Sequence, residues 1–169
     1  VDVVIDGLSE TFPDQKAGFN ERGKAYQKEI QDLHQWAQGR VNSLPEEKRV
    51  LVTSHDAFNY TGKAYGLEVV GVQGISTEAE PSLAAVSQTV DFIKERRIKA
   101  IFVESSVSPD VIKRVSEDAN VTIGGELFSD AMGIPGTMET FDGETYDVGT
   151  YIGMLKHNIN TAVSSLEKE

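Results

Sequence analysis

The sequence has no cysteine, no apolar run long enough to cross a bilayer, and no excess of basic charge. Without cysteine the chain can form no disulfide, thiolate metal site or cysteine nucleophile, so any metal ligand must be histidine, aspartate or glutamate. The 27 acidic residues outnumber the 16 lysines and arginines, and the net charge of -11 argues against a nucleic-acid partner. These absences leave an acidic chain of single-domain size, whose chemistry depends on histidine and carboxylates.

A long amphipathic helix is predicted in the first third of the chain. Residues 19–41 contain no proline, and apolar side chains recur there at spacings of three and four, namely Tyr26, Ile30, Leu33, Trp36, Ala37 and Val41. The helix should end at Leu44, because proline at the next position disfavours helical backbone in the residue before it.

The rest of the sequence alternates short β-branched runs with helical stretches. Strands are predicted at residues 49–53, 68–72, 100–103 and 120–124, and helices at 58–65, 81–97, from Ser108-Pro109-Asp110 onward, and at 151–166. This order predicts an α/β fold with a mostly parallel four-stranded sheet flanked by helices. Residues 126–149 remain as one long irregular stretch, and loops of that length are usually functional or disordered.

Candidate site residues lie where the predicted strands end, which is where open parallel sheets bind ligands. His55 ends the first strand, Glu104 and Ser105 end the third, and Asp130 follows the fourth. His55 is a candidate metal ligand, general base or helix cap, and Asp130 a candidate ligand or cap. Glu104 and Ser105 could be metal ligands, hydrogen-bond partners of a ligand, or residues at the start of the next helix.

Other chemistries find less support in the sequence. His34 reads as a solvated or interface residue, and His157 as a packed or half-exposed residue of the last helix. There is no HExxH, no GxSxG and no phosphate-binding loop, and Ser54 beside His55 should point to the other side of its strand. An α/β enzyme using His55, Glu104 and Asp130 as acid/base groups is the alternative hypothesis.

Four motifs resemble one known family, the TroA-like manganese- and zinc-binding lipoproteins of ABC importers. They occur in the family's order and cover nearly the whole chain: His55-Asp56-Ala57-Phe58-Asn59-Tyr60 with Ala64-Tyr65-Gly66; Phe102-Val103-Glu104-Ser105-Ser106; Gly124-Gly125-Glu126-Leu127-Phe128-Ser129-Asp130-Ala131-Met132-Gly133; and Gly149-Thr150-Tyr151 through His157-Asn158. No single motif would suffice, but four together make chance similarity a poor explanation.

The resemblance implies a division of the chain and a set of site residues. In this family one long helix joins two α/β lobes, and the metal ion lies between them with two ligands from each lobe. By resemblance, residues 1–45 are the connecting helix and its lead-in, and residues 46–169 are the C-terminal metal-binding lobe. His55 resembles the third ligand and Asp130 the fourth, with Glu104 and Ser105 as supporting residues.

The implied function is capture of Mn or Zn, with a preference for manganese, and delivery to an ABC permease in the membrane. The implied location is the periplasm or the outer face of the cell membrane, with a lipid-anchored parent and no catalytic activity, and some members of the family have been called adhesins. The two ligands of the N-terminal lobe have no counterpart here, so we expect weak metal binding, and we expect the uncovered helix face to favour a homodimer.

Overall fold

The computed structural model describes residues 1–75 and 81–168. Their contacts divide the chain into two compact units, Val1–Trp36 and Ala37–Glu169. The boundary falls inside one helix, α2 (Lys16–Asn42). No helix within the described residues is both long and apolar enough to cross a membrane.

The first unit is helical. It contains α1 (Asp2–Thr11), the short 3-10 helix η1 (Pro13–Gln15) and most of α2. A side-chain hydrogen bond of 2.6 Å from Gln27 to Asp2 ties α1 to α2. The long helix is confirmed and starts before the predicted residue 19, whereas α1 was not predicted, because its apolar residues at the start of the chain were read only as a lead-in.

The second unit holds the α/β lobe. Its elements are η2 (Glu46–Lys48), β1 (Val50–His55), α3 (Asn59–Tyr65), β2 (Glu68–Gln73), α4 (Leu83–Arg96), β3 (Ala100–Glu104), α5 (Asp110–Ala119), β4 (Thr122–Leu127), β5 (Met138–Phe141), β6 (Glu144–Asp147) and α6 (Tyr151–Glu167). The alternation of strands and helices confirms the predicted α/β class. It also places the ends of all four long strands at one edge of the lobe.

The four long strands are parallel and bond as two pairs. β1 pairs with β2, with Val50 opposite Glu68, and β3 pairs with β4, with Ala100 opposite Thr122. β1 and β3 lie side by side, which brings the two pairs together as one parallel layer. Their carboxyl ends therefore meet, as expected for a parallel sheet whose ligands bind beyond the strand ends.

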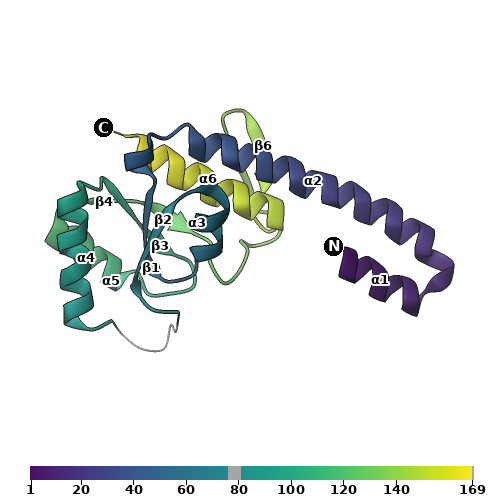
Figure 1. The fold of residues 1–169 in the computed structure, drawn as a ribbon, viewed down its shortest axis with the longest axis horizontal. Coiled ribbons are helices and arrows are strands. Elements are labelled where there is room, and N and C mark those ends of the chain that lie inside the picture. Colours follow the sequence, from purple (N-terminus) through teal and green to yellow (C-terminus); the bar gives the residue numbers. More distant parts are fainter. Residues whose placement is uncertain (76–80, 169) are drawn as a thin grey trace. The chain divides into compact units, whose positions relative to one another are not determined.

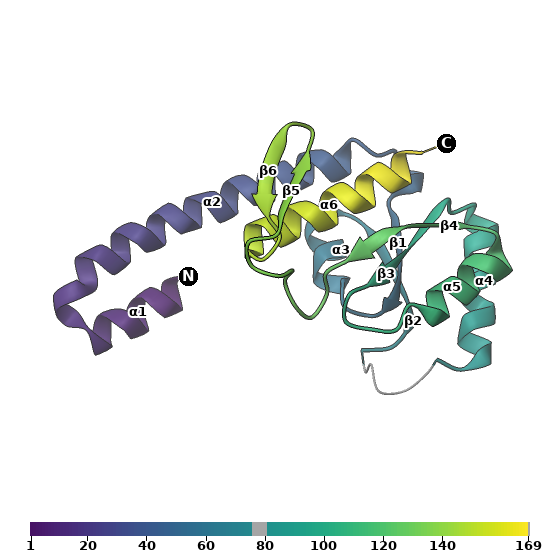
Figure 2. The same ribbon diagram turned by 180° about the vertical axis from the view of Figure 1, so that it is seen from behind.

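Two sets of helices cover the two faces of this layer. Valines and isoleucines of β1, β2 and β3 pack with α4 and α5 in one buried cluster, and α4 and α5 lie together on that side in Figures 1 and 2. On the other face α6 packs against β4, and the Ser165 hydroxyl donates a 2.7 Å hydrogen bond to the carbonyl of Gly124. Because both faces are covered, the central strands β1 and β3 are buried almost throughout, whereas the outer strands β2 and β4 are partly exposed.

A further error of the sequence prediction lies in residues 126–149, which were expected to be irregular. They contain the antiparallel hairpin β5–β6, closed by Asp142 and Gly143 with positive φ angles of 50° and 80°. Figures 1 and 2 show this hairpin beside α6. Its strands are only four residues long and largely exposed, so they carry too little apolar alternation to stand out in the sequence.

Several element boundaries also differ from the prediction. β4 begins at Thr122 and runs on to Leu127, because Asn120 takes a left-handed conformation that ends α5. α4 begins after Ser82, whose side chain accepts a hydrogen bond from the backbone of Ala85, so Pro81, the predicted first residue of this helix, lies before it. Ser108 does accept a hydrogen bond from the Asp110 N–H, at 3.3 Å, but the N-cap of α5 is Pro109.

Candidate functional site

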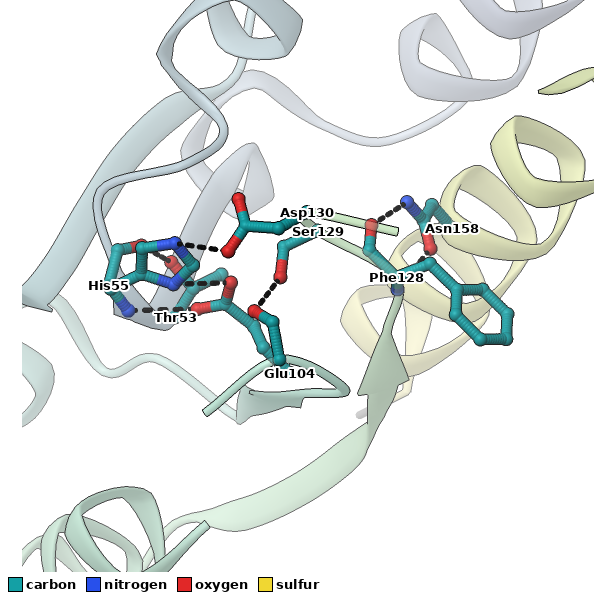
Figure 3. A network of polar contacts seen from close by, with 8 residues as sticks. Thr53, His55, Glu104, Phe128, Ser129, Asp130 and Asn158 are labelled. Carbon is teal, nitrogen blue, oxygen red and sulfur yellow. Dashed lines mark hydrogen bonds and ion pairs between the residues drawn. The ribbon is translucent and has the colours of Figure 1, made fainter. Parts of the chain in front are cut away.

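His55 is the last residue of β1 and is almost fully buried, with 2% of its surface exposed. Its backbone N–H donates a 2.8 Å hydrogen bond to Glu104 Oε1, and its carbonyl accepts one of 2.9 Å from the Thr53 hydroxyl (Figure 3). Gly71 of β2 faces this turn, where a Cβ would come within 2.9 Å of the backbone of His55 and Asp56. The strand end can therefore bend over β2 only because residue 71 lacks a side chain.

Glu104, at the end of β3, orients the His55 ring. Its Oε2 lies 2.7 Å from His55 Nδ1, which is ion-pair distance although the two atoms are not aligned as a hydrogen bond. At that separation a proton must lie between the two atoms, since two lone pairs would repel each other. Burial raises the pKa of Glu104 above its ordinary value, and hydrogen bonds from the His55 backbone and the Ser129 hydroxyl, with the His55 ring, offset part of that rise.

Asp130 lies on the segment that follows β4, opposite the other nitrogen of the His55 ring. Its Oδ2 is 3.5 Å from His55 Nε2, and 59% of its side chain is exposed. The preceding residue, Ser129, is tied to Ser106 by a hydroxyl–hydroxyl hydrogen bond of 2.5 Å. With Nδ1 directed at Glu104, Nε2 is the ring atom that remains available to a ligand shared with Asp130 (Figure 3).

The arrangement offers two donors to a cation and no more. A neutral imidazole with one carboxylate suits zinc and manganese alike, and the buried carboxylate behind the ring is the usual way to fix a metal-binding histidine. Within residues 1–75 and 81–168 there is no group of three or more histidine, aspartate or glutamate side chains arranged to hold a metal ion. These residues thus form at most half of a typical coordination sphere.

The predicted site residues are brought together with one exception. His55, Glu104 and Asp130 converge, but the side chain of Ser105 is exposed, and only its backbone N–H engages the neighbouring strand, at Leu127. Ser54 is buried, and within the described chain its hydroxyl has no hydrogen-bond partner, so no Ser–His contact of a hydrolase is formed. That geometry does not support a serine hydrolase.

The other two histidines lie elsewhere. His34 is exposed on α2 in the first unit, as predicted for a solvated residue. His157 is half-buried on α6, where it contacts Glu139 and the carbonyl of Glu126.

Asn158 is a residue that the sequence analysis left without a role. It is buried on α6, with 7% of its surface exposed, and its side chain bonds both the N–H and the carbonyl of Phe128. Its signal in the sequence was an amide side chain among the apolar residues that form the buried face of a helix. A buried amide needs partners for both its donor and its acceptor, which should have suggested a structural role.

The fold and the strand-end residues define an open parallel α/β lobe of the kind that binds small ligands at its strand ends. The family model described as zinc-uptake complex component A, periplasmic, matches residues 1–165, and the chain belongs to that family. Names in this family describe metal-binding and metal-uptake proteins, so it is one of solute-binding proteins and not of enzymes.

Individual relatives agree with this assignment. The chain is 44% identical over 172 residues to the manganese-binding lipoprotein MntA of Bacillus subtilis, covering 99% of this chain and 53% of MntA. It is 41% identical over 173 residues to the zinc-binding protein TroA of Treponema pallidum, with the same coverage of 99% and 53%. The solved structure of periplasmic TroA superposes with a TM-score of 0.90 at 40% identity, covering 99% of this chain and 59% of that one. The chain therefore spans about half the length of the curated relatives it matches.

Proposed function

We propose that this chain is the metal-carrying C-terminal lobe and connecting helix of a solute-binding protein for a metal-importing ABC transporter. In this proposal residues 1–45 are the connecting helix with its lead-in, and residues 46–169 are the lobe. His55 Nε2 and a carboxylate oxygen of Asp130 bind a divalent transition-metal ion, manganese or zinc. The metal is cargo, which the whole protein delivers to a permease from the outer side of the cell membrane.

One observation carries the proposal. The two nitrogens of His55 have different neighbours, with the buried Glu104 carboxylate at 2.7 Å from Nδ1 and the exposed Asp130 carboxylate at 3.5 Å from Nε2. Glu104 thereby holds the proton on Nδ1 and leaves the lone pair of Nε2 directed at Asp130. That is the tautomer a metal ion requires, with a second donor already beside it.

The relatives support both metals. The MntA relative is named for manganese and the TroA relative for zinc. A site of imidazole and carboxylate binds zinc more tightly than manganese by the Irving–Williams order, whichever metal is transported. We propose manganese as the transported ion. In a direct competition, zinc should bind more tightly than manganese.

Calorimetric titration of Mn²⁺ and Zn²⁺ into the chain tests the site. His55→Ala and Asp130→Ala should each weaken binding by at least about tenfold, because each removes one of only two protein ligands. Asp91→Ala, an exposed substitution on α4, is the control and should bind as the unmodified chain does. Unchanged affinity in both site variants would refute the assignment.

The proposed homodimer through the helix stays a prediction, and the oligomeric state in solution tests it. Light scattering across a range of protein concentrations should show association if the apolar face of α2 pairs between copies. The prediction rests on the apolar stripe of α2, of which Tyr26 is 39% exposed whereas Leu33 is buried at 3%. A monomer at every concentration would rule it out.

A further inference from the structure

The ring of His157 has a hydrogen-bond acceptor at each nitrogen. Nδ1 lies 2.7 Å from Glu139 Oε2 on β5, and Nε2 lies 2.9 Å from the carbonyl oxygen of Glu126 on β4. A carbonyl oxygen and an ionised carboxylate can only accept, so both contacts are satisfied only if both ring nitrogens carry protons. The geometry thus points to an imidazolium whose charge faces Glu139.

The side chain of the next residue, Asn158, is hydrogen-bonded to Phe128, directly after the end of β4. Its Oδ1 accepts a 2.9 Å hydrogen bond from the N–H of Phe128, and its Nδ2 donates one of 2.7 Å to the carbonyl of Phe128 (Figure 3). The Phe128 ring also packs against the His157 ring, with centroids 4.8 Å apart. Two adjacent residues of α6, which we call the α6 clamp, therefore hold the end of β4 and the start of β5.

The segment between these two anchors carries Asp130. Residues 129–138 connect Phe128, which directly follows β4, to Glu139, the second residue of β5. The Asp130 side chain is mostly exposed, and its recorded polar contact is the 3.5 Å approach to His55 Nε2. Inside the segment, the Ser129 hydroxyl is bonded to Ser106 and the Gly133 N–H donates to the carbonyl of Val148. Because Phe128 lies only two residues before Asp130, the distance from Asp130 to His55 also depends on how firmly Phe128 is held.

We propose that His157, as an imidazolium, and Asn158 are positioning residues that set Asp130 at ligand distance from His55. This inference rests on the proposed function, because it gives Asp130 the role of a metal ligand. Neither clamp residue touches the metal in this proposal. They act by tying Phe128 and Glu139, the residues on either side of the segment, to α6, which is itself packed against β4.

The charge state of His157 is the first test. In nitrogen-15 NMR of the metal-free chain at neutral pH, both ring nitrogens of His157 should show the chemical shifts of protonated nitrogen. His34, exposed on α2, serves as the reference histidine in the same spectrum. A neutral His157 ring, with one unprotonated nitrogen, would overturn the imidazolium clamp.

The positioning role is tested by hydrogen exchange and metal titration of the variants His157→Gln and Asn158→Asp, with His34→Gln as control. Exchange at the hydrogen-bonded amides of Phe128 and Gly133 should speed up about tenfold or more, while the amides of Val52 and Thr53 in β1 should keep their rates. Metal affinity should fall by about tenfold. The variant His157→Arg, which keeps a cation with several donors, should recover part of both effects.

The outcomes separate the two proposals. If Asp130→Ala loses metal binding while His157→Gln and Asn158→Asp bind as tightly as the unmodified chain, the clamp is refuted and the metal site stands. If exchange rises equally in β1 and at Phe128 and Gly133, the substitutions loosen the whole lobe, and the positioning role is likewise refuted. If Asp130→Ala itself binds metal normally, the proposed function fails, whatever the exchange rates show.

Discussion

Replacing Glu104 by glutamine should damage metal binding far more than it damages folding. The carboxylate does two things for His55, accepting the backbone N–H at 2.8 Å and facing Nδ1 at 2.7 Å. In Glu104→Gln the amide oxygen can keep the first contact, which leaves the NH₂ group facing Nδ1. The ring must then accept at Nδ1 and carry its proton on Nε2, the atom proposed to bind the metal.

The two effects differ in size. The substitution preserves shape and hydrogen bonding and removes a buried charge, so the free energy of unfolding should change by no more than about 1 kcal/mol. Metal affinity should fall by about 10- to 100-fold, the usual loss when the partner of a metal-binding histidine is altered. Glu104→Ala, by contrast, leaves two buried donors unpaired and should cost about 3–5 kcal/mol of stability.

Two measurements check this. Urea unfolding in the presence of a chelator gives the stability of the metal-free chain, and calorimetric titration with Zn²⁺ and Mn²⁺ gives the affinity. Glu117→Gln, an exposed substitution of the same kind on α5, is the control and should change neither. If Glu104→Gln binds metal as tightly as the unmodified chain, or loses stability as severely as Glu104→Ala, the tautomer argument is wrong.

Three further predictions concern stability and pH. Because burial raises the pKa of Glu104 in the folded chain, that state holds a proton which the unfolded chain has lost above the ordinary value of 4.5. The stability of the metal-free chain should therefore fall as pH rises from 4.5 through the folded pKa, and Glu104→Gln should remove that dependence in urea titrations at stepped pH. Phe102→Ala should cost about 3–5 kcal/mol in urea unfolding, since this ring is fully buried on the α6 side of the sheet, whereas half-exposed Phe12→Ala should cost under about 1 kcal/mol. Gly71→Ala should cost about 1–3 kcal/mol and weaken metal binding, because its Cβ would meet the backbone of His55 at 2.9 Å, while Gly74→Ala, with nothing within 4 Å, should leave the metal affinity unchanged.

The strong periodic signals of the sequence predicted the α/β class and the long helix. The continuous apolar run Ala100–Val103 lies in β3 and the apolar stripe of the first third lies on α2, as predicted. Such segments are predictable because burial of many apolar residues determines their structure. Gly66 ends α3 as predicted, with φ at 77°. The hairpin β5–β6 was missed because its stability comes from contacts distant in sequence, such as that between Glu139 and His157.

The candidate site was predictable in part. Strand-end position and resemblance selected His55, Glu104 and Asp130, and the structure brings these three together. Neither the strand-end position nor the resemblance could show which nitrogen of His55 faces which carboxylate, because that depends on the relative placement of β1, β3 and the segment after β4. Ser105 illustrates the limit, since it is the neighbouring Ser106 whose hydroxyl reaches the site segment.

The proposed ligands differ sharply in how much water they see. The Asp130 side chain is 59% exposed and the His55 side chain only 3%. A hydrated ion arriving from solution can exchange one water for the Asp130 carboxylate while it keeps the rest of its hydration shell. It must shed further water before it reaches Nε2, and that step is slow for ions that hold water tightly. The Asp130 carboxylate would then set the rate at which a metal ion is captured. The His55 imidazole would determine which ion stays bound.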